Sequence, residues 1–391
     1  MPVAVDASRF ERVRARTLRL CAPLSPEDAQ LQSMPDASPA KWHLAHTTWF
    51  FETFVLAPLG IAPVAPAYAF LFNSYYEAAG PRAARDRRGL VSRPSLAEIH
   101  AYRAEVDRRM LGALVEHRAD ASVVELGLQH EQQHQELILT DIKHALGTQP
   151  TQPAYRHDLA RARAVAAPLS FARHDGGLVE IGAGPDGFAF DNERPRHRVF
   201  VEPFELASRP ACNAHVLAFI AEGGYSRPEL WLSDGWATVQ REGWTAPLYW
   251  NGDGSLYDLA GVRAIDPAEP ACHLSFYEAD ALATWAGARL PTEAEWEHAG
   301  VLAPSTDDDQ LHPGAVWEWT RSAYAPYPGF QPLGGALGEY NGKFMSGQVV
   351  LRGGSCFTPR DHARATYRNF FPPQARWQMT GARFARDARS T

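Results

Sequence analysis

Residues 127–146 read GLQHEQQHQELILTDIKHAL, and this stretch decides how the first half of the chain is interpreted. In an α-helix, positions i, i+4 and i+11 lie on one face. His130, His134 and Asp141 therefore share a stripe, whereas Glu131 points about a quarter-turn away from His130. Because two imidazoles one turn apart can reach the same metal ion, the stretch predicts a helix that carries a metal site.

Three kinds of metal site fit this spacing. In a metalloprotease, Glu131 would be the general base. In a two-histidine, one-carboxylate site, Asp141 would complete the set, although it lies two helical turns from His134. In a three-histidine site, the motif KWHLAHTTWFFE would supply His43 or His46. The alternative is that the histidines bind no metal and are ordinary surface residues or hydrogen-bonded core residues.

The choice of metal depends on how many positions the protein leaves open. Three neutral imidazoles would leave the ion its full charge and open coordination positions. Iron(II) held in this way can bind dioxygen and a substrate together, while zinc would suit hydrolysis. The spacing by itself does not choose between them.

Helical patterns dominate the chain up to about residue 150. Besides the quoted stretch, the segments with this pattern are 6–24, 38–59 and 95–117. Ser38 with Pro39, and later Ser95, are expected to cap the second and third helices. Four helices, with a longer connection at 58–94, predict a helical bundle over residues 1–150.

The rest of the chain has another character. Residues 151–168 are rich in Pro and Ala and read as a linker. From 169 to 391 the sequence has many glycines, prolines and tryptophans and short apolar runs such as GLVEIGAG, HRVFVEPFELA and VVLRGGSC. These predict short strands in an α+β domain, with one clear helix at 275–287. The fold class is thus α followed by α+β.

Composition limits the partners. A net charge of −7 and a pI near 6.1 argue against a nucleic-acid-binding surface. No apolar run of 18 residues occurs, which argues against a membrane span. The four cysteines form no CxxC pair and no disulfide framework. Because the first 20 residues also lack a continuous apolar stretch, the expected location is the cytoplasm. Neither the oligomeric state nor the oxidation level of a product follows from these features.

Ten motifs, in order along residues 10–385, carry a resemblance to a known family. They are WHLAHTTWF, FNSYYEAAGPRAARDRRGLVSRPS, HEQQHQELILTDIKHAL, DNERPRH, GGYSRPELWLSDGW, RLPTEAEWEHAG, VWEWTRSAYAPYPGF, GEYNGKFM, VLRGGSC and TYRNFFPPQARWQ. Together they resemble the EgtB family, the non-haem iron sulfoxide synthases of ergothioneine biosynthesis.

The resemblance implies a DinB-like four-helix bundle followed by a C-type-lectin-like domain of the formylglycine-generating-enzyme, or sulfatase-modifying, kind. Its iron(II) ligands fall on His46, His130 and His134. His43 is then not a ligand, and Glu131 is not a protease base.

The family uses dioxygen to join a sulfur donor to C2 of the imidazole ring of hercynine. The positions that match its hercynine-binding residues are Gln133, Asn369 and Phe370. An aromatic wall suits a trimethylammonium group, which offers no hydrogen bond. Tyr75 and Tyr76 match the catalytic tyrosines of one branch, in which a phenol delivers a proton or hydrogen atom. Which of the two acts as donor is left open.

The same branch implies a donor site. Arg82 and Arg85 would meet the donor's carboxylate, and Phe371 would line its pocket. The branch that uses γ-glutamyl-cysteine has an acidic residue at position 371 and an arginine where Ala375 stands. The expected donor is therefore cysteine.

Two departures from the family pattern matter. Thr358 and Ala363 stand about where a formylglycine-generating enzyme carries cysteines, so that activity is not expected. In residues 344–349, FMSGQV replaces the usual FMCNQY. This change opens an alternative, a selenoneine synthase that forms a C–Se bond from a selenosugar. A sugar donor has no α-carboxylate, so the convergence of Arg82 and Arg85 would discriminate.

Other segments of the resemblance concern folding. RGGS and RLPTEAEWE are signatures of the fold, and Arg352 and Glu295 are expected to stabilise buried loops. Two rival functions remain. A non-catalytic thiol or ligand sensor would not need Tyr75 and Tyr76, and a metalloprotease would not need oxygen.

Overall fold

A computed structural model describes residues 6–159, 168–301, 315–339 and 341–388. The chain divides into two compact units. The first contains Met1–His157 with two later segments, Asp186–Phe188 and Leu333–Tyr340, and the second contains the remainder. Residues 160–167 of the expected linker lie outside the described residues.

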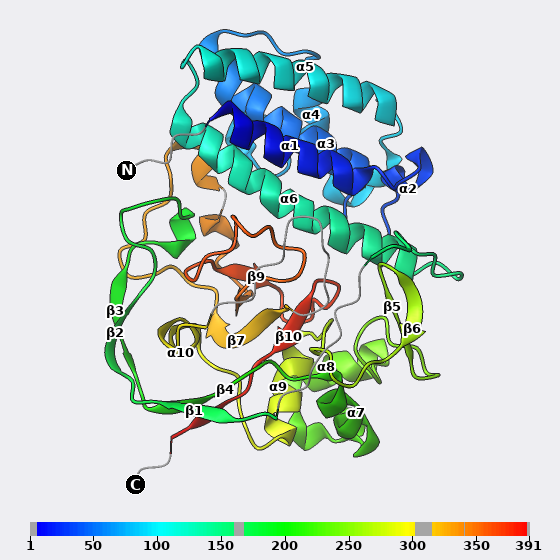
Figure 1. Cartoon of the computed structure of the whole chain (residues 1–391), viewed down its shortest axis with the longest axis vertical. Coiled ribbons are helices and arrows are strands. Elements are labelled where there is room, and N and C mark those ends of the chain that lie inside the picture. Colours follow the sequence, from blue (N-terminus) through cyan, green and yellow to red (C-terminus); the bar gives the residue numbers. More distant parts are fainter. Residues whose placement is uncertain (1–5, 160–167, 302–314, 340, 389–391) are drawn as a thin grey trace. The chain divides into compact units, whose positions relative to one another are not determined.

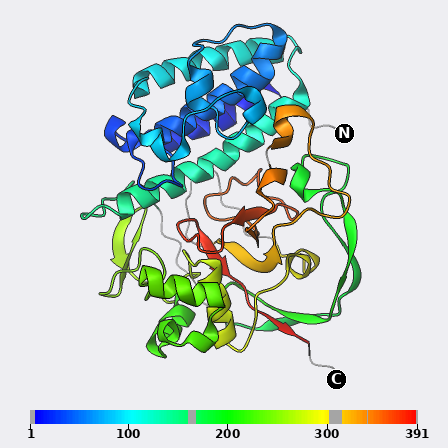
Figure 2. The same ribbon diagram turned by 180° about the vertical axis from the view of Figure 1, so that it is seen from behind.

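Four long helices pack side by side in the first unit, as Figure 1 shows and Figure 2 shows from behind. They are α1 (Ala7–Cys21), α3 (Ala40–Phe51), α5 (Leu96–Val115) and α6 (Ala121–Gly147). The shorter elements of this unit are α2 (Pro26–Gln30), the π-helix η1 (Glu52–Leu56), η2 (Ala57–Leu59), α4 (Tyr68–Phe72), η3 (Glu77–Ala79), η4 (Arg85–Leu90) and η8 (Gly335–Glu339).

The helix ends test the predicted caps. Ser95 caps α5 as expected, in a reciprocal pair with Glu98. The Ser38 cap is wrong, because Pro39 is the N-cap of α3 and makes no side-chain hydrogen bond. Ser38 instead donates its amide to Asp141 Oδ2 at 2.8 Å and accepts from Arg88 through its hydroxyl. A tertiary contact has replaced the local one.

Close packing of α3 on α6 brings the two histidine motifs together. A Cβ at Gly127 would lie 2.6 Å from the Phe51 ring and 2.9 Å from the Phe50 ring. Only glycine therefore allows the two helices to approach this closely. Phe51 also belongs to the apolar core that α1, α5 and α6 share.

Glu131 lies in the middle of the bundle, completely buried. Its carboxylate accepts from Arg14 at 2.9 Å, from Thr17 at 2.6 Å and from Arg103. Burial raises the pKa of Glu131, but Arg103 and Arg14 outweigh it and lower the pKa to about 2. The carboxylate is thus ionised, and it ties α6 to both α1 and α5.

In the part of the second unit that the structure describes, the strands form four small sheets. Their strand orders are β1-β4-β11, β10-β7-β8-β9, β2-β3 and β5-β6. The strands are β1 (Phe171–His174), β2 (Gly177–Ile181), β3 (His197–Val201), β4 (Phe204–Ala207), β5 (Ser255–Asp258), β6 (Gly261–Ala264), β7 (Trp317–Ala323), β8 (Val349–Arg352), β9 (Asn369–Phe371), β10 (Thr380–Ala382) and β11 (Ala385–Asp387). The runs quoted from the sequence become β2, β3, β4 and β8.

The expected helix of this unit is α9 (Phe276–Trp285), which Ser275 caps. Three further helices of this unit were not predicted from the sequence, namely α7 (Asn213–Ala221), α8 (Ser233–Glu242) and α10 (Glu293–His298). Arg352 is fully buried, pairs with Glu297 and donates to the Ala365 carbonyl, while Glu295 pairs with Arg289. The prediction that Arg352 and Glu295 stabilise buried loops is confirmed.

Among the described residues, no helix is both long and apolar enough to cross a membrane.

Removing the central carboxylate should destabilise the bundle strongly. We expect Glu131→Ala to lower the free energy of unfolding by about 3–5 kcal/mol, because the buried Arg103 loses its carboxylate partner and Arg14 keeps only Asp107. Glu105→Ala, which breaks only the exposed pairs with Arg108 and Arg109, should cost about 1 kcal/mol or less. Urea denaturation of both variants measures the difference, and equal losses would contradict the central role of Glu131.

The same group predicts a pH dependence. The folded pKa of Glu131 lies below its ordinary value of 4.5, so its stabilisation is complete above that value. It should be lost as the pH falls toward 2. Glu131→Gln should show a shallower fall over this range, measured as the urea midpoint against pH.

Candidate metal centre

Three histidines from two helices meet in the first unit. His46 on α3 and His130 and His134 on α6 each place a ring nitrogen within 4.8 Å of the others. The Nε2 atoms of His46 and His130 are 3.2 Å apart. All three side chains are buried. The three histidines come from two helices whose close approach at Gly127 leaves no room for a side chain, so the grouping is a product of the tertiary structure.

The surroundings keep these rings neutral. Burial lowers the pKa of His130 to about 3. It lowers the pKa of His46 and of His134 well below the usual value, and repulsion from His130 adds to both shifts. A neutral imidazole has a free lone pair, which is the form that binds a metal.

The ring of His46 is fixed in position and tautomer. It stacks between Trp42 and Trp49, with ring centroids at 4.5 and 5.6 Å and interplanar angles of 12° and 18°. Its Nδ1 lies 2.6 Å from the Phe72 carbonyl oxygen, which can only accept. The Nδ1 atom therefore carries the proton, and the bare Nε2 faces His130.

His134 is in contact with two further polar groups. Its Nδ1 lies 2.7 Å from Nδ1 of His43, and Nε2 of His43 lies 3.0 Å from Asp141 Oδ2. Asp141 is thus connected to His134 through His43, and it is not part of the three-histidine group. Among the described residues, the two-histidine, one-carboxylate interpretation is not supported.

The donor set fits a metal ion. Two nitrogens that each lie about 2.1 Å from one ion, at right angles, are about 3 Å apart. The 3.2 Å between His46 and His130 matches this separation. The three-histidine site predicted from the sequence is therefore geometrically sound, and it could bind a metal ion.

The protease interpretation fails on Glu131. Both oxygens of this carboxylate are occupied by Arg14, Arg103 and Thr17, on the side of α6 that faces α1 and α5. A general base must reach a metal-bound water, and Glu131 is committed elsewhere.

Tyr76 lies near the histidines and Tyr75 lies further out. Tyr76 is completely buried, with its ring 5.8 Å from that of Trp49, which in turn stacks on His46. Tyr75 is half-buried and packs against Tyr76 at 4.7 Å. Gln133 is half-buried on α6, beside His134.

Arg82 and Arg85 have separate partners. Arg82 pairs with Glu77 at 2.6 Å, and Arg85 donates to the backbone carbonyl of Asp36 at 2.5 Å. Both are exposed or partly exposed, and the two guanidiniums do not share a partner among these contacts.

Asn369, Phe370 and Phe371 form strand β9 of the second unit. Phe370 stacks on Tyr324 with centroids 3.9 Å apart, and Asn369 Oδ1 accepts from the Phe370 amide. Phe371 meets Trp377 edge-on at 6.3 Å. Their roles toward substrates stay predictions.

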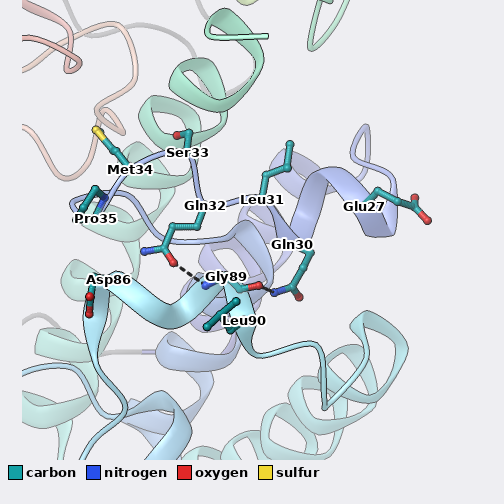
Figure 3. Close-up of a pocket in the computed structure, with 10 residues that line it drawn as sticks. All are labelled: Glu27, Gln30, Leu31, Gln32, Ser33, Met34, Pro35, Asp86, Gly89 and Leu90. Atoms are coloured by element: carbon teal, nitrogen blue, oxygen red, sulfur yellow. Dashed lines mark hydrogen bonds between the residues drawn. The ribbon is translucent and has the colours of Figure 1, made fainter.

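A surface pocket of about 510 Å³ lies elsewhere on the first unit, between the α2–α3 connection and η4 (Figure 3). Gln32 and Gln30 hydrogen-bond the amide and carbonyl of Gly89 across it. None of the predicted site residues lines this pocket.

Both parts of the chain match known families. Residues 9–138 match the DinB superfamily, and residues 163–307 and 311–388 match the sulfatase-modifying factor enzyme 1-like domain. The hercynine oxygenase of Mycolicibacterium thermoresistibile is 33% identical over 96% of this chain and 93% of its own. That of Mycobacterium tuberculosis is 32% identical over 97% and 98%.

This chain belongs to the hercynine oxygenase family. The resemblance to EgtB proteins is thereby confirmed, as is the order of a DinB-type helical region and a sulfatase-modifying-type domain. The formylglycine-generating enzyme of Streptomyces coelicolor, which is 32% identical, matches only 37% of this chain. A solved structure, Treponema denticola variable protein 1, matches with a TM-score of 0.35 and 14% identity, too low to support an inference.

Several residues around the three histidines of this hercynine oxygenase-family chain were not predicted from the sequence. Trp42 and Trp49 flank His46, and the carbonyl of Phe72 sets its tautomer. The two tryptophans lie four residues before and three after His46, a helical spacing that could have suggested a shared face. The Phe72 carbonyl has no sequence signal, because any residue supplies one.

Loss of one ligand should empty the site. We expect His134→Ala to abolish stoichiometric binding of iron(II) or cobalt(II), since only two strong ligands would remain. His144→Ala removes a histidine of the same helix that hydrogen-bonds Ser33, and it should bind metal normally. Metal content after anaerobic loading and desalting measures both. Full occupancy in the His134 variant would contradict the ligand set.

Proposed function

We propose that this chain is an iron(II)- and dioxygen-dependent oxygenase that acts on hercynine and forms a carbon–sulfur bond at imidazole C2. The observation that carries the proposal is the buried group of three neutral histidines in a member of the hercynine oxygenase family. The assignment of His46, His130 and His134 as the iron ligands is part of this proposal.

A ferrous ion at these nitrogens would supply open positions at which dioxygen, the hercynine imidazole and the donor's sulfur meet. The protein's own contribution is separate. It keeps the three imidazoles unprotonated by burying them, and it holds the His46 ring between two indoles. Those indoles also exclude water from that side of the site.

Hercynine recognition is assigned to Gln133, Asn369 and Phe370. Gln133 is next to His134 on α6 and can hydrogen-bond the substrate. Phe370 presents an aromatic ring, and the stack with Tyr324 beneath it makes that surface rigid. Aromatic faces attract quaternary ammonium groups. Phe371 on the same strand is assigned to the donor pocket.

The donor has two candidates. Cysteine follows from the family branch that Tyr75, Tyr76 and Phe371 match. A selenosugar, giving a C–Se bond and a selenoneine synthase, is favoured by a specific observation. Arg82 pairs with Glu77 and Arg85 with the Asp36 carbonyl, so each guanidinium already has a partner other than a donor carboxylate. The pair of Arg82 and Glu77 is exposed and therefore weak, so cysteine stays the first candidate.

The partners are thus small molecules, with no nucleic acid and no membrane. We place the protein in the cytoplasm, which its four free cysteines fit.

An assay that varies the donor and the supply of dioxygen tests the proposed reaction. Iron(II)-loaded protein with hercynine and dioxygen should give the C2-substituted product with one donor of three offered in parallel, namely cysteine, γ-glutamyl-cysteine and a selenosugar. Product masses and the oxygen consumed are measured together. Turnover at an unchanged rate without oxygen would refute the proposal, and preference for γ-glutamyl-cysteine would refute both donor candidates.

Tyr76 is our choice for the catalytic phenol, because it is the tyrosine buried against the aromatic group around His46. Tyr76→Phe should slow bond formation by about 10²–10⁴-fold, the usual contribution of a positioned proton donor. Oxidation of the thiol should account for part of the oxygen consumed. Tyr75→Phe serves as the matched control and should act more mildly. Unchanged product ratios in both variants would remove the tyrosines from the mechanism.

A further inference from the structure

His43 and Asp141 stand directly behind the proposed metal ligand His134, and the proposed function uses neither of them. Both side chains are buried. His43 lies on α3, one turn before His46, while Asp141 lies on α6, two turns after His134. The three side chains form a line from Asp141 through His43 to His134.

The hydrogen bonds of this line agree with one arrangement of protons on the two rings. The Asp141 carboxylate can only accept, so Nε2–H of His43 donates to Oδ2 at 3.0 Å. We take this Nε2–H as the single ring proton of His43, which leaves its Nδ1 as an acceptor. It therefore takes the Nδ1–H of His134 at 2.7 Å. This leaves the lone pair of His134 on Nε2, where it can serve a metal ion.

Asp141 is itself held in place. Its Oδ2 also accepts the backbone amide of Ser38 at 2.8 Å. The Ser38 hydroxyl accepts from Arg88, whose guanidinium lies 3.4 Å over the Trp42 ring. Trp42 stacks on His46. Asp141 and the His46 ring are thus connected through Ser38, Arg88 and Trp42.

We propose that His43 and Asp141 are positioning residues that fix the tautomer and ring orientation of His134, so that the two helices present a prearranged set of nitrogens. The inference rests on the proposed metal site and deepens it. A carboxylate behind a ligating histidine makes the imidazole a stronger donor, and loss of such a partner costs about 10–100-fold in metal affinity.

The test compares two substitutions of one residue. His43→Leu removes both hydrogen bonds at little change in volume, whereas His43→Gln offers an acceptor and a donor from one terminal group. Cobalt(II) serves as the probe, with its dissociation constant from calorimetry and its visible absorption spectrum as readouts. We expect His43→Leu to weaken cobalt(II) binding by about 10–100-fold and to shift the spectrum. His43→Gln should restore most of the affinity.

Controls separate positioning from stability. Gln135→Leu removes buried hydrogen bonds from α6 to Thr17 and the Val13 carbonyl, on the α1 side of the helix. It should lower the unfolding temperature but leave cobalt(II) affinity and spectrum unchanged. Asp141→Asn keeps the shape and weakens the bond to His43, so it should shift the spectrum in the same direction by less. This variant keeps the test decisive if His43→Leu does not fold.

Wild-type affinity and spectrum in both His43→Leu and Asp141→Asn would overturn the inference. Equal weakening in His43→Gln and His43→Leu would overturn its hydrogen-bond basis. Wild-type protein that binds no cobalt(II) would refute the metal site together with the inference. Wild-type protein that binds cobalt(II) but, loaded with iron(II), does not oxidise hercynine would refute the proposed function alone, and the order of cobalt(II) affinities would still decide the positioning role.

Discussion

A carboxylate in the middle of a helical bundle must be neutralised, and the first unit is organised around that requirement. Glu131 receives Arg14 from α1 and Arg103 from α5, together with the Thr17 hydroxyl. These contacts fix the rotation of α6 about its own axis. Because His130 and His134 lie on the neighbouring face, the same rotation turns them toward α3. The polar contacts of Glu131 and the histidine group thus lie on adjacent faces of α6.

Helix α3 supplies the opposite wall of the site, and several of its residues hold the histidines in position. His46 is held between two indoles and its tautomer is set by a backbone carbonyl. His43, one turn earlier, meets His134 of the facing helix. Close approach of the helices is possible because position 127 carries no side chain. Packing and hydrogen bonds thus hold the histidine rings in position before any ion binds.

The fold explains why shared domains do not mean shared chemistry. The second unit matches the sulfatase-modifying factor enzyme 1-like family over most of its length, yet Thr358 and Ala363 are not cysteines. In this chain its buried ion pairs, such as that of Arg352, stabilise loops. The histidines that could bind a metal belong to the DinB-type unit. Function therefore has to be argued from side chains and their geometry.

The sequence by itself determined the helices of the first half, the short strands β2, β3, β4 and β8, and the two histidines of α6, because periodicity and spacing are local properties. It left open whether His43, His46 or Asp141 would join His130 and His134, and only the family resemblance favoured His46. The tertiary structure decided this, since the distance between side chains on different helices depends on how those helices pack. In the tertiary structure Ser38 contacts Asp141 instead of capping α3, and Glu131 pairs with two arginines that are far away in the sequence. Such partners lie about 30 to 120 residues apart, a separation at which local patterns carry no information.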